Sequence, residues 1–254
     1  MTSYGGESLS GLREVTPALG AQDPQTGRTV RWNVADFGLA WFAGLVGALI
    51  GSSIALSISG KDDISPALIF FVVFPFQNGA TLASVWWSST SRGLGSWARD
   101  FGVRFIQRDV IWALAGVVLQ YAVGILTAIM TSVFDVSTDQ AVAKELDDIS
   151  GFAAVGAVLV VVFIAPFTEE LLYRGVLLRS LIRKMSDTGA ILVSGAVFAV
   201  VHLLGDFGTA PLLPGLFVLG CVLGYVTVQT GNLSRAFAIH MGFNAVTAIA
   251  LLVN

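Results

Sequence analysis

Two adjacent glutamates, Glu169 and Glu170, lie inside a long apolar part of the sequence. The surrounding segment, residues 152–182, is mostly apolar, and its other charged residues are Arg174 and Arg179. A charge at membrane depth costs at least ~2.5–3.5 kcal/mol on insertion scales, so such residues are rare and usually functional. A carboxylate in this position is a candidate general base. Its function depends on which side chains lie beside it.

The only two histidines of the chain, His202 and His240, lie in apolar segments that follow the glutamates. Histidine can accept a proton, donate a hydrogen bond or bind a metal near neutral pH. His202 follows Phe198 by four residues, and Asn244 follows His240 by the same interval. On a helix each pair shares one face. We therefore expect the Phe198 ring to cover one side of His202, and Asn244 to act together with His240.

The two glutamates are expected to do different work. Successive residues of an α-helix point about 100° apart, so the two carboxylates face different directions. Glu170 and Arg174 are four residues apart and suit a buried ion pair. We therefore predict that Glu169 faces a catalytic cavity, while Arg174 neutralises Glu170 and Tyr173 supports the site. A purely structural network of the glutamates with Arg174 and Arg179 is the alternative.

Counting from the nearest polar helix ends gives the expected depths. Glu169 lies 15 residues before Lys184, and His202 lies 15 residues after Asp187. Both are thus roughly 22 Å from that end, and His240, eight residues after Asn232, is roughly 12 Å from it. Helix tilt can remove the difference, so the sequence permits these groups to meet.

A carboxylate, two imidazoles and a carboxamide can together hydrolyse an amide bond. Glu169 and His202 can activate a water molecule, and His240 and Asn244 can donate hydrogen bonds to the developing oxyanion. Alternatively, Glu169, His202 and His240 can hold a divalent metal such as zinc. Asparagine is a poor zinc ligand, which favours the metal-free chemistry with no cofactor required.

The order and spacing of these residues resemble a known signature. Glu169-Glu170-x-x-Tyr173-Arg174, then Phe198-x-x-x-His202, then His240-x-x-x-Asn244 is similar to the three motifs of the CPBP family of intramembrane proteases, which includes the CAAX prenyl proteases. The resemblance covers about residues 165–245. It implies that Glu169 and His202 activate water and that His240 and Asn244 stabilise the oxyanion. Nothing in the sequence selects a prenyl group.

The elements that must position these residues are membrane-spanning helices. The chain has 254 residues, of which 55% are hydrophobic and 12% charged, against about 25% charged in a soluble domain; its mean hydropathy is +0.78. A helix needs ~20 apolar residues to cross a bilayer, and long unbroken apolar runs exclude a transmembrane β-barrel. The fold class is therefore an all-α polytopic bundle of about seven spans. They are expected at residues 37–59, 66–90, 110–134, 150–184, 188–204, 215–229 and 236–253.

Three regions follow from this pattern. Residues 1–36 are polar and are expected to form a mobile N-terminal tail. Residues 37–149 hold three spans and a basic connector, 92–109, that suits the lipid interface. Residues 150–254 form a four-helix catalytic core.

The basic residues predict the orientation of the chain. With alternating spans, 12 of the 14 lysines and arginines lie on the side of the N-terminus, and only Lys61 and Lys144 lie opposite. Cytoplasmic loops are enriched in lysine and arginine. We expect a multi-pass plasma-membrane protein, bacterial in character, with a cytoplasmic N-terminus, an external C-terminus and a cavity open to the cytoplasmic leaflet.

The function predicted from the sequence is an intramembrane endopeptidase. Its expected partners are membrane lipid and a peptide or membrane-protein substrate, and not nucleic acid; the oligomeric state is undetermined. A proton-coupled transporter is the alternative from another class, although transporters often contain paired repeats and none is visible here. A catalytically silent scaffold or immunity protein is the third reading.

Overall fold

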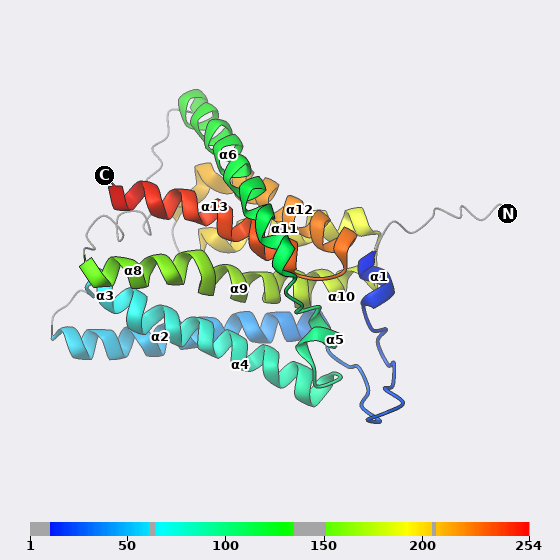
Figure 1. Ribbon diagram of the computed structural model, residues 1–254. Helices are drawn as coiled ribbons and strands as arrows, with labels where there is room; N and C mark the ends of the chain where they lie inside the picture. Colours follow the sequence, from blue (N-terminus) through cyan, green and yellow to red (C-terminus); the bar gives the residue numbers. More distant parts are fainter. Residues whose placement is uncertain (1–10, 61–63, 135–150, 205–206, 254) are drawn as a thin grey trace.

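A computed structural model describes residues 11–60, 64–134, 151–204 and 207–253 of the chain (Figure 1). In these residues all regular structure is helical, apart from an isolated antiparallel bridge between Gln22 and Thr29. The expected all-α class is confirmed. The first half contains α1 (Gly11–Val15), α2 (Val34–Ser59), α3 (Pro66–Leu68), η1 (Ile69–Val73), α4 (Phe74–Arg92), α5 (Trp97–Phe101), η2 (Gln107–Trp112) and α6 (Ala113–Phe134).

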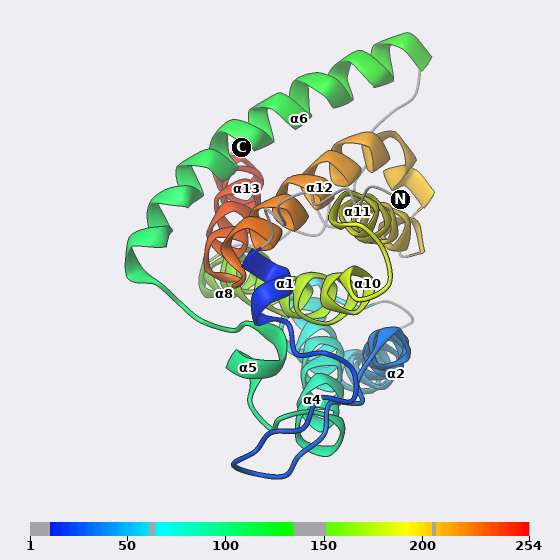
Figure 2. The same ribbon diagram turned by 90° about the vertical axis from the view of Figure 1, so that its right-hand side faces the viewer.

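The second half begins with one helical run that carries the glutamates. This run consists of α8 (Gly151–Leu159), η3 (Val160–Ile164), α9 (Ala165–Glu169), η4 (Glu170–Leu178) and α10 (Arg179–Ile182). It is followed by α11 (Asp187–Leu203), η5 (Phe207–Leu212), α12 (Leu213–Thr230) and α13 (Ser234–Val253). Figure 2 shows α6 crossing the outside of the bundle next to α12 and α13.

Five helical segments are long and apolar enough to span a membrane, so the prediction of a polytopic membrane protein is confirmed. The predicted number of seven spans is not confirmed. Helix α11 is apolar but has only 17 residues, and α13 is a 20-residue helix outside the set of five. The five are Val34–Ser59, Pro66–Arg92, Gln107–Ser132, Ala154–Ile182 and Ala210–Thr230.

Two of these spans contain a proline preceded by a π-helical stretch. Pro75 follows η1, and Pro166 follows η3. Proline lacks an N–H and cannot complete the helical ladder. A wider π turn is a common local solution to such an interruption, and π segments often mark functional sites. A third π segment, η4, begins at Glu170 itself.

Small residues allow α2 and α4 to approach closely. Gly47 and Gly51 of α2 are buried, and a side chain at either position would collide with the backbone around Phe76 or Val73. Such small-residue faces are typical of helix pairs in membranes. Helix α2 begins at Asn33, whose side chain accepts the N–H of Ala35.

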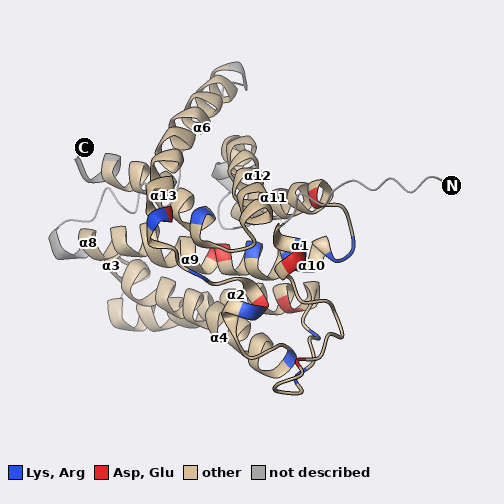
Figure 3. Cartoon of the chain, turned by 45° about the vertical axis from the view of Figure 1, so that its right-hand side comes forward, with Lys and Arg blue, Asp and Glu red and all other residues tan. Residues whose placement is uncertain are grey.

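The long helices alternate in direction, so the ends of α4, α10 and α12 lie together with the beginnings of α2, α11 and α13 (Figures 1 and 2). Most of the described charged residues gather at this end, as Figure 3 shows. We call it the charged end of the bundle.

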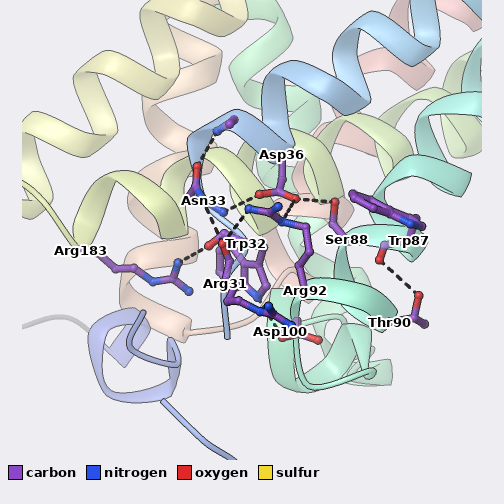
Figure 4. Close-up of polar contacts among 11 residues, drawn as sticks. Arg31, Trp32, Asn33, Asp36, Trp87, Ser88, Thr90, Arg92, Asp100 and Arg183 are labelled. Carbon is purple, nitrogen blue, oxygen red and sulfur yellow. Dashed lines mark hydrogen bonds and ion pairs between the residues drawn. The ribbon is translucent and has the colours of Figure 1, made fainter. Parts of the chain in front are cut away.

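The expectation of a mobile N-terminal tail is wrong for residues 11–36. Leu12, Val30 and Trp32 are fully buried. The Trp32 Nε1–H donates to Asp100 at 2.9 Å, and the guanidinium of Arg183 stacks 3.7 Å above the Trp32 ring (Figure 4). This segment packs because a few apolar residues within its polar sequence fit between the helix ends. Residues 1–10 lie outside the described part of the chain.

The basic connector also differs from its predicted lipid-facing role. Arg92 pairs with the buried Asp36 at 3.0 Å (Figure 4), and Arg99 pairs with Asp23 at 2.8 Å. Only the later arginines of this connector, Arg104 and Arg108, are exposed without an ion pair within the described ranges. The N-terminal segment therefore uses the first connector arginines as internal contacts.

Candidate active site

Glu170 is a completely buried carboxylate. Its Oε1 atom forms an ion pair with Arg174 Nη1 at 3.1 Å, and both side chains are inaccessible to solvent. Arg174 Nη2 also donates to the carbonyl oxygen of Gly220 at 3.2 Å. A buried charge is costly unless it is paired in this way. The alternative network with Arg179 is not formed, because Arg179 donates instead to Gly231 and Thr16.

Both glutamates contact the same imidazole. Nδ1 of His240 lies 2.9 Å from Oε1 of Glu170, and Nε2 lies 3.6 Å from Oε2 of Glu169. The sequence had assigned the two carboxylates to separate environments on the basis of α-helical geometry. The π register that begins at Glu170 widens the helix and changes the angle between successive side chains. His240 is thus flanked by carboxylates on both sides.

The two glutamates differ in accessibility. The Glu169 side chain is 30% exposed, whereas that of Glu170 is 0% exposed. Glu169 is therefore accessible from outside the protein, and Glu170 is not. This asymmetry agrees with the predicted division of work, in which Glu169 faces the accessible side and Glu170 is neutralised by Arg174.

Glu170 determines which nitrogen of His240 carries a proton. Oε1 of Glu170 accepts from two directions, since it also faces the Arg174 guanidinium. A carboxylate oxygen in that position accepts hydrogen bonds, so Nδ1 of His240 is the protonated nitrogen. Nε2 is therefore the nitrogen left for other partners, and it is the one that faces Glu169.

His202 has a similarly fixed orientation. Its Nδ1 lies 2.7 Å from the carbonyl oxygen of Phe198, one helical turn earlier on α11. A carbonyl only accepts, so Nδ1 carries the proton and the lone pair of the neutral ring is on Nε2. The ring of Phe198 is 4.8 Å from that of His202, centroid to centroid. The expected cover of His202 by Phe198 is present.

Phe198 connects all three motifs. It is buried, and its ring centroid lies 5.9 Å from that of His240 and 5.2 Å from that of Tyr173. The Arg174 guanidinium carbon lies 4.6 Å from the same ring centroid. Tyr173 also packs on Phe37 of α2, which brings the first span against the site. One or more residues of each motif therefore lie around this ring, namely Tyr173, Arg174, His202 and His240.

Asn244 has a partner that the sequence analysis missed. Its Nδ2 donates to the carbonyl oxygen of Val161 in η3 at 2.9 Å. In η3 the Ala165 N–H bonds to Val160 five residues back, so the next donor in this register would be residue 166. Pro166 has no N–H, which leaves the Val161 carbonyl without its helical donor. The proline within the apolar run was the available signal.

Gly220 is the second residue that was missed. A side chain there would lie 2.9 Å from the backbone of Gly195 on α11. The missing side chain lets α11 and α12 approach closely and exposes the Gly220 carbonyl to Arg174. Small residues at corresponding positions on successive apolar helices were the relevant signal.

The candidate metal ligands do not form a metal site. Within the described residues, no three His, Cys, Asp or Glu side chains are grouped closely enough to hold a metal ion. One nitrogen of His240 is already used by Glu170, and one nitrogen of His202 faces a carbonyl. These bonds use Nδ1 of each ring and leave Nε2, as in histidines that bind metals, so the choice of metal-free chemistry stays a prediction.

Comparison with known proteins identifies the segment that carries the site. Residues 151–246 match the family model described as type II CAAX prenyl endopeptidase, Rce1-like. Searches of curated proteins and of solved structures gave no match. The matched segment begins with α8 and includes Glu169, His202, His240 and Asn244. In this membrane protein, residues 151–246 are thus similar to the type II CAAX prenyl endopeptidases, in agreement with the resemblance of its three motifs.

Proposed function

We propose that the protein is an intramembrane endopeptidase that hydrolyses peptide bonds of membrane-associated or peptide substrates, with Glu169 as the general base. One observation carries the proposal. Within a membrane-spanning segment, an accessible carboxylate faces Nε2 of a histidine whose Nδ1 is held by a second, buried carboxylate. General bases and their orienting partners are arranged in this way in hydrolytic sites.

The proposed reaction begins with water. Glu169 takes a proton from the water molecule while its oxygen attacks the carbonyl carbon of the scissile bond. The lone pair on Nε2 of His202 accepts the second water hydrogen and fixes the orientation of the nucleophile. Glu169 then gives its proton to the leaving nitrogen as the C–N bond breaks. No metal or cofactor takes part in these steps.

His240 and Asn244 stabilise the negative charge that develops on the carbonyl oxygen. Since Nδ1–H of His240 is used by Glu170, the hydrogen bond to the oxyanion comes from Nε2 in the imidazolium form. The Glu170 carboxylate stabilises that form, and Arg174 pairs with Glu170. An amide nitrogen has two hydrogens, so Asn244 can bond Val161 and the oxyanion together. Such donors are worth about 10²–10³ in rate.

The proposed setting follows the charge distribution. We place the charged end of the bundle, with the N-terminus, in the cytoplasm of a plasma membrane, because 12 of the 14 basic residues lie on that side of the predicted topology. Residues 150–254 then form the catalytic core, and the site opens towards the cytoplasmic leaflet.

The test is cleavage in reconstituted vesicles by the full chain, with peptide substrates that carry or lack a prenyl group. Glu169→Gln should reduce the cleavage rate by at least about 10²-fold, as expected for loss of a general base, and His202→Ala should do likewise. The matched control is Glu14→Gln, which changes an exposed glutamate of α1 outside the site. Undiminished cleavage by both site variants would refute the mechanism.

In parallel, membrane proteomics of cells with wild-type or Glu169→Gln protein should reveal the accumulated precursor.

A further inference from the structure

A pocket of about 330 Å³ lies at the charged end of the bundle, apart from the candidate active site. Its walls come from the N-terminal segment, from the region of α5 and the following connector, and from the turn between α12 and α13. The lining residues are Val15, Pro17, Leu94, Ala98, Arg99, Arg104, Thr230, Gly231 and Asn232. Asn232 lies eight residues before His240, so the pocket is about 12 Å from that residue along the helix axis.

The pocket has two arginines in its wall. Arg99 donates to Asp23 at 2.8 Å, and Asp23 also accepts from Thr26 and from the backbone of Gln25. These contacts, above all the hydrogen bond from Arg99, hold the pKa of the Asp23 carboxyl well below its usual range. Arg104 is exposed and has no carboxylate partner in the part of the chain that the structure describes. Arg104 is thus a charge in the pocket wall with no counter-ion among the described residues.

A third arginine lies behind the wall. Arg179 is completely buried, and its hydrogen-bond acceptors are neutral: the Gly231 carbonyl at 2.7 Å and the Thr16 hydroxyl at 3.1 Å. Its Nε has no hydrogen-bond partner among the described residues. A buried cation without a paired carboxylate is costly. It adds positive potential beside Gly231 in the pocket wall.

The buried carboxylate of Asp100 does not neutralise the arginines of the pocket wall. Asp100 is fully buried, and its carboxylate accepts from Trp32, Ser89 and the backbone N–H groups of Leu94 and Ser96. Its lone pairs are therefore already used inside the protein. The pocket remains a site where positive charge exceeds negative charge.

The position of the pocket indicates the source of the anion. The spanning segment Ala210–Thr230 ends at a residue that lines the pocket. The ends of membrane spans lie at the level of the lipid headgroups. Phe105, next to Arg104, is 61% exposed and extends the surface with an apolar ring. The pocket wall also contains apolar side chains, among them Val15, Leu94 and Ala98. Such a wall suits the glycerol and acyl chain of a lipid better than a free ion.

We propose that this pocket binds the phosphate group of an anionic membrane-lipid headgroup, with Arg104 as its principal ligand and Arg99 as the second. Arginine binds phosphate oxygens through two parallel N–H groups, and attraction of a basic residue to anionic lipid is worth about 1 kcal/mol even without a defined pocket. Bound lipid would stabilise the N-terminal segment against the helix ends.

The experiment uses the full chain in nanodiscs of phosphatidylcholine with or without phosphatidylglycerol, and counts retained lipid by native mass spectrometry. Wild type should retain one phosphatidylglycerol in preference to phosphatidylcholine. Arg104→Gln should weaken that preference by about fivefold or more, the ratio that corresponds to one lost charge contact. The matched control is Arg108→Gln, an exposed arginine on the same connector outside the pocket, which should retain the wild-type preference.

Three results would overturn the proposal. Equal retention of both lipids by wild type would show that the pocket has no headgroup preference. Equal losses in the Arg104 and Arg108 variants would show diffuse surface attraction. Displacement of phosphatidylglycerol by an equimolar concentration of inorganic phosphate would assign the site to the free ion, whereas retention would support the lipid. Both arginines lie outside the candidate active site, so peptide cleavage plays no part in this test.

Discussion

Nδ1 of His240 lies 2.9 Å from Oε1 of the buried Glu170, on the side of the imidazole opposite Glu169. This relationship assigns Glu170 an orienting role and leaves Nε2 for chemistry. Arg174 completes the arrangement, because it pairs with a carboxylate that is completely buried.

Glu170→Gln should both destabilise the protein and reduce cleavage. It leaves Arg174 buried without its carboxylate, and breaking a buried ion pair in this way costs about 3–5 kcal/mol. Thermal unfolding in detergent measures the loss. The double variant Glu170→Met/Arg174→Met removes both charges and should regain most of the stability, but cleavage should stay low because His240 has lost its orienting acceptor. Recovery of activity together with stability would mean that Glu170 is only structural.

Asn244→Ala should destabilise the protein by about 1–3 kcal/mol, the cost of an unsatisfied buried carbonyl, here that of Val161. In a Pro166→Ala background the restored N–H can serve that carbonyl, so the same substitution should cost less. A double-mutant cycle on the free energy of unfolding should give a coupling of about 1 kcal/mol.

Cleavage separates the two roles of Asn244. If the amide also contacts the oxyanion, activity should remain low in Asn244→Ala/Pro166→Ala even though stability recovers. If the double-mutant cycle gives no coupling free energy, Asn244 does not replace the N–H that Pro166 fails to donate to the Val161 carbonyl.

Gly220→Ala should destabilise the protein by about 1–3 kcal/mol, as is typical when a methyl group is added to a closely packed contact. The added carbon would lie 2.9 Å from the Gly195 Cα and would push α11 away from α12. Gly124→Ala on α6 is the matched control, since nothing lies within 4 Å of that position. The control should be neutral or slightly stabilising because alanine favours helix more than glycine does. Equal effects of the two substitutions would refute the close α11–α12 contact.

Acid should release the N-terminal segment. Arg99 lowers the pKa of Asp23 in the folded protein, so this pair contributes stability that is fully present above the ordinary aspartate pKa of about 4. The contribution is lost as the pH falls from there through the lower folded value. Hydrogen exchange of residues 11–33 should therefore rise in that acidic range, and Asp23→Asn should show the raised exchange already at neutral pH. Unchanged exchange in Asp23→Asn would contradict an anchoring role for the pair.

The sequence by itself determined the class of protein and the residues that gather at the site. Apolar runs of this length must lie in a bilayer or a large core, and polar groups within them have few partners except one another. That reasoning predicted the Glu170–Arg174 pair and the cover of His202 by Phe198, both of which depend only on spacing along one helix. It also predicted the family whose model residues 151–246 match.

Tertiary structure decided how the helices are rotated and how deeply they begin. His240 lies 2.9 Å from Glu170, so it reaches the level of the glutamates despite its apparent difference in depth. The π register at Glu170 turns both carboxylates to His240, and the interruption at Pro166 gives Asn244 its partner. The N-terminal segment packs through a few buried residues such as Trp32. These features depend on contacts between distant segments, which local periodicity and composition do not encode.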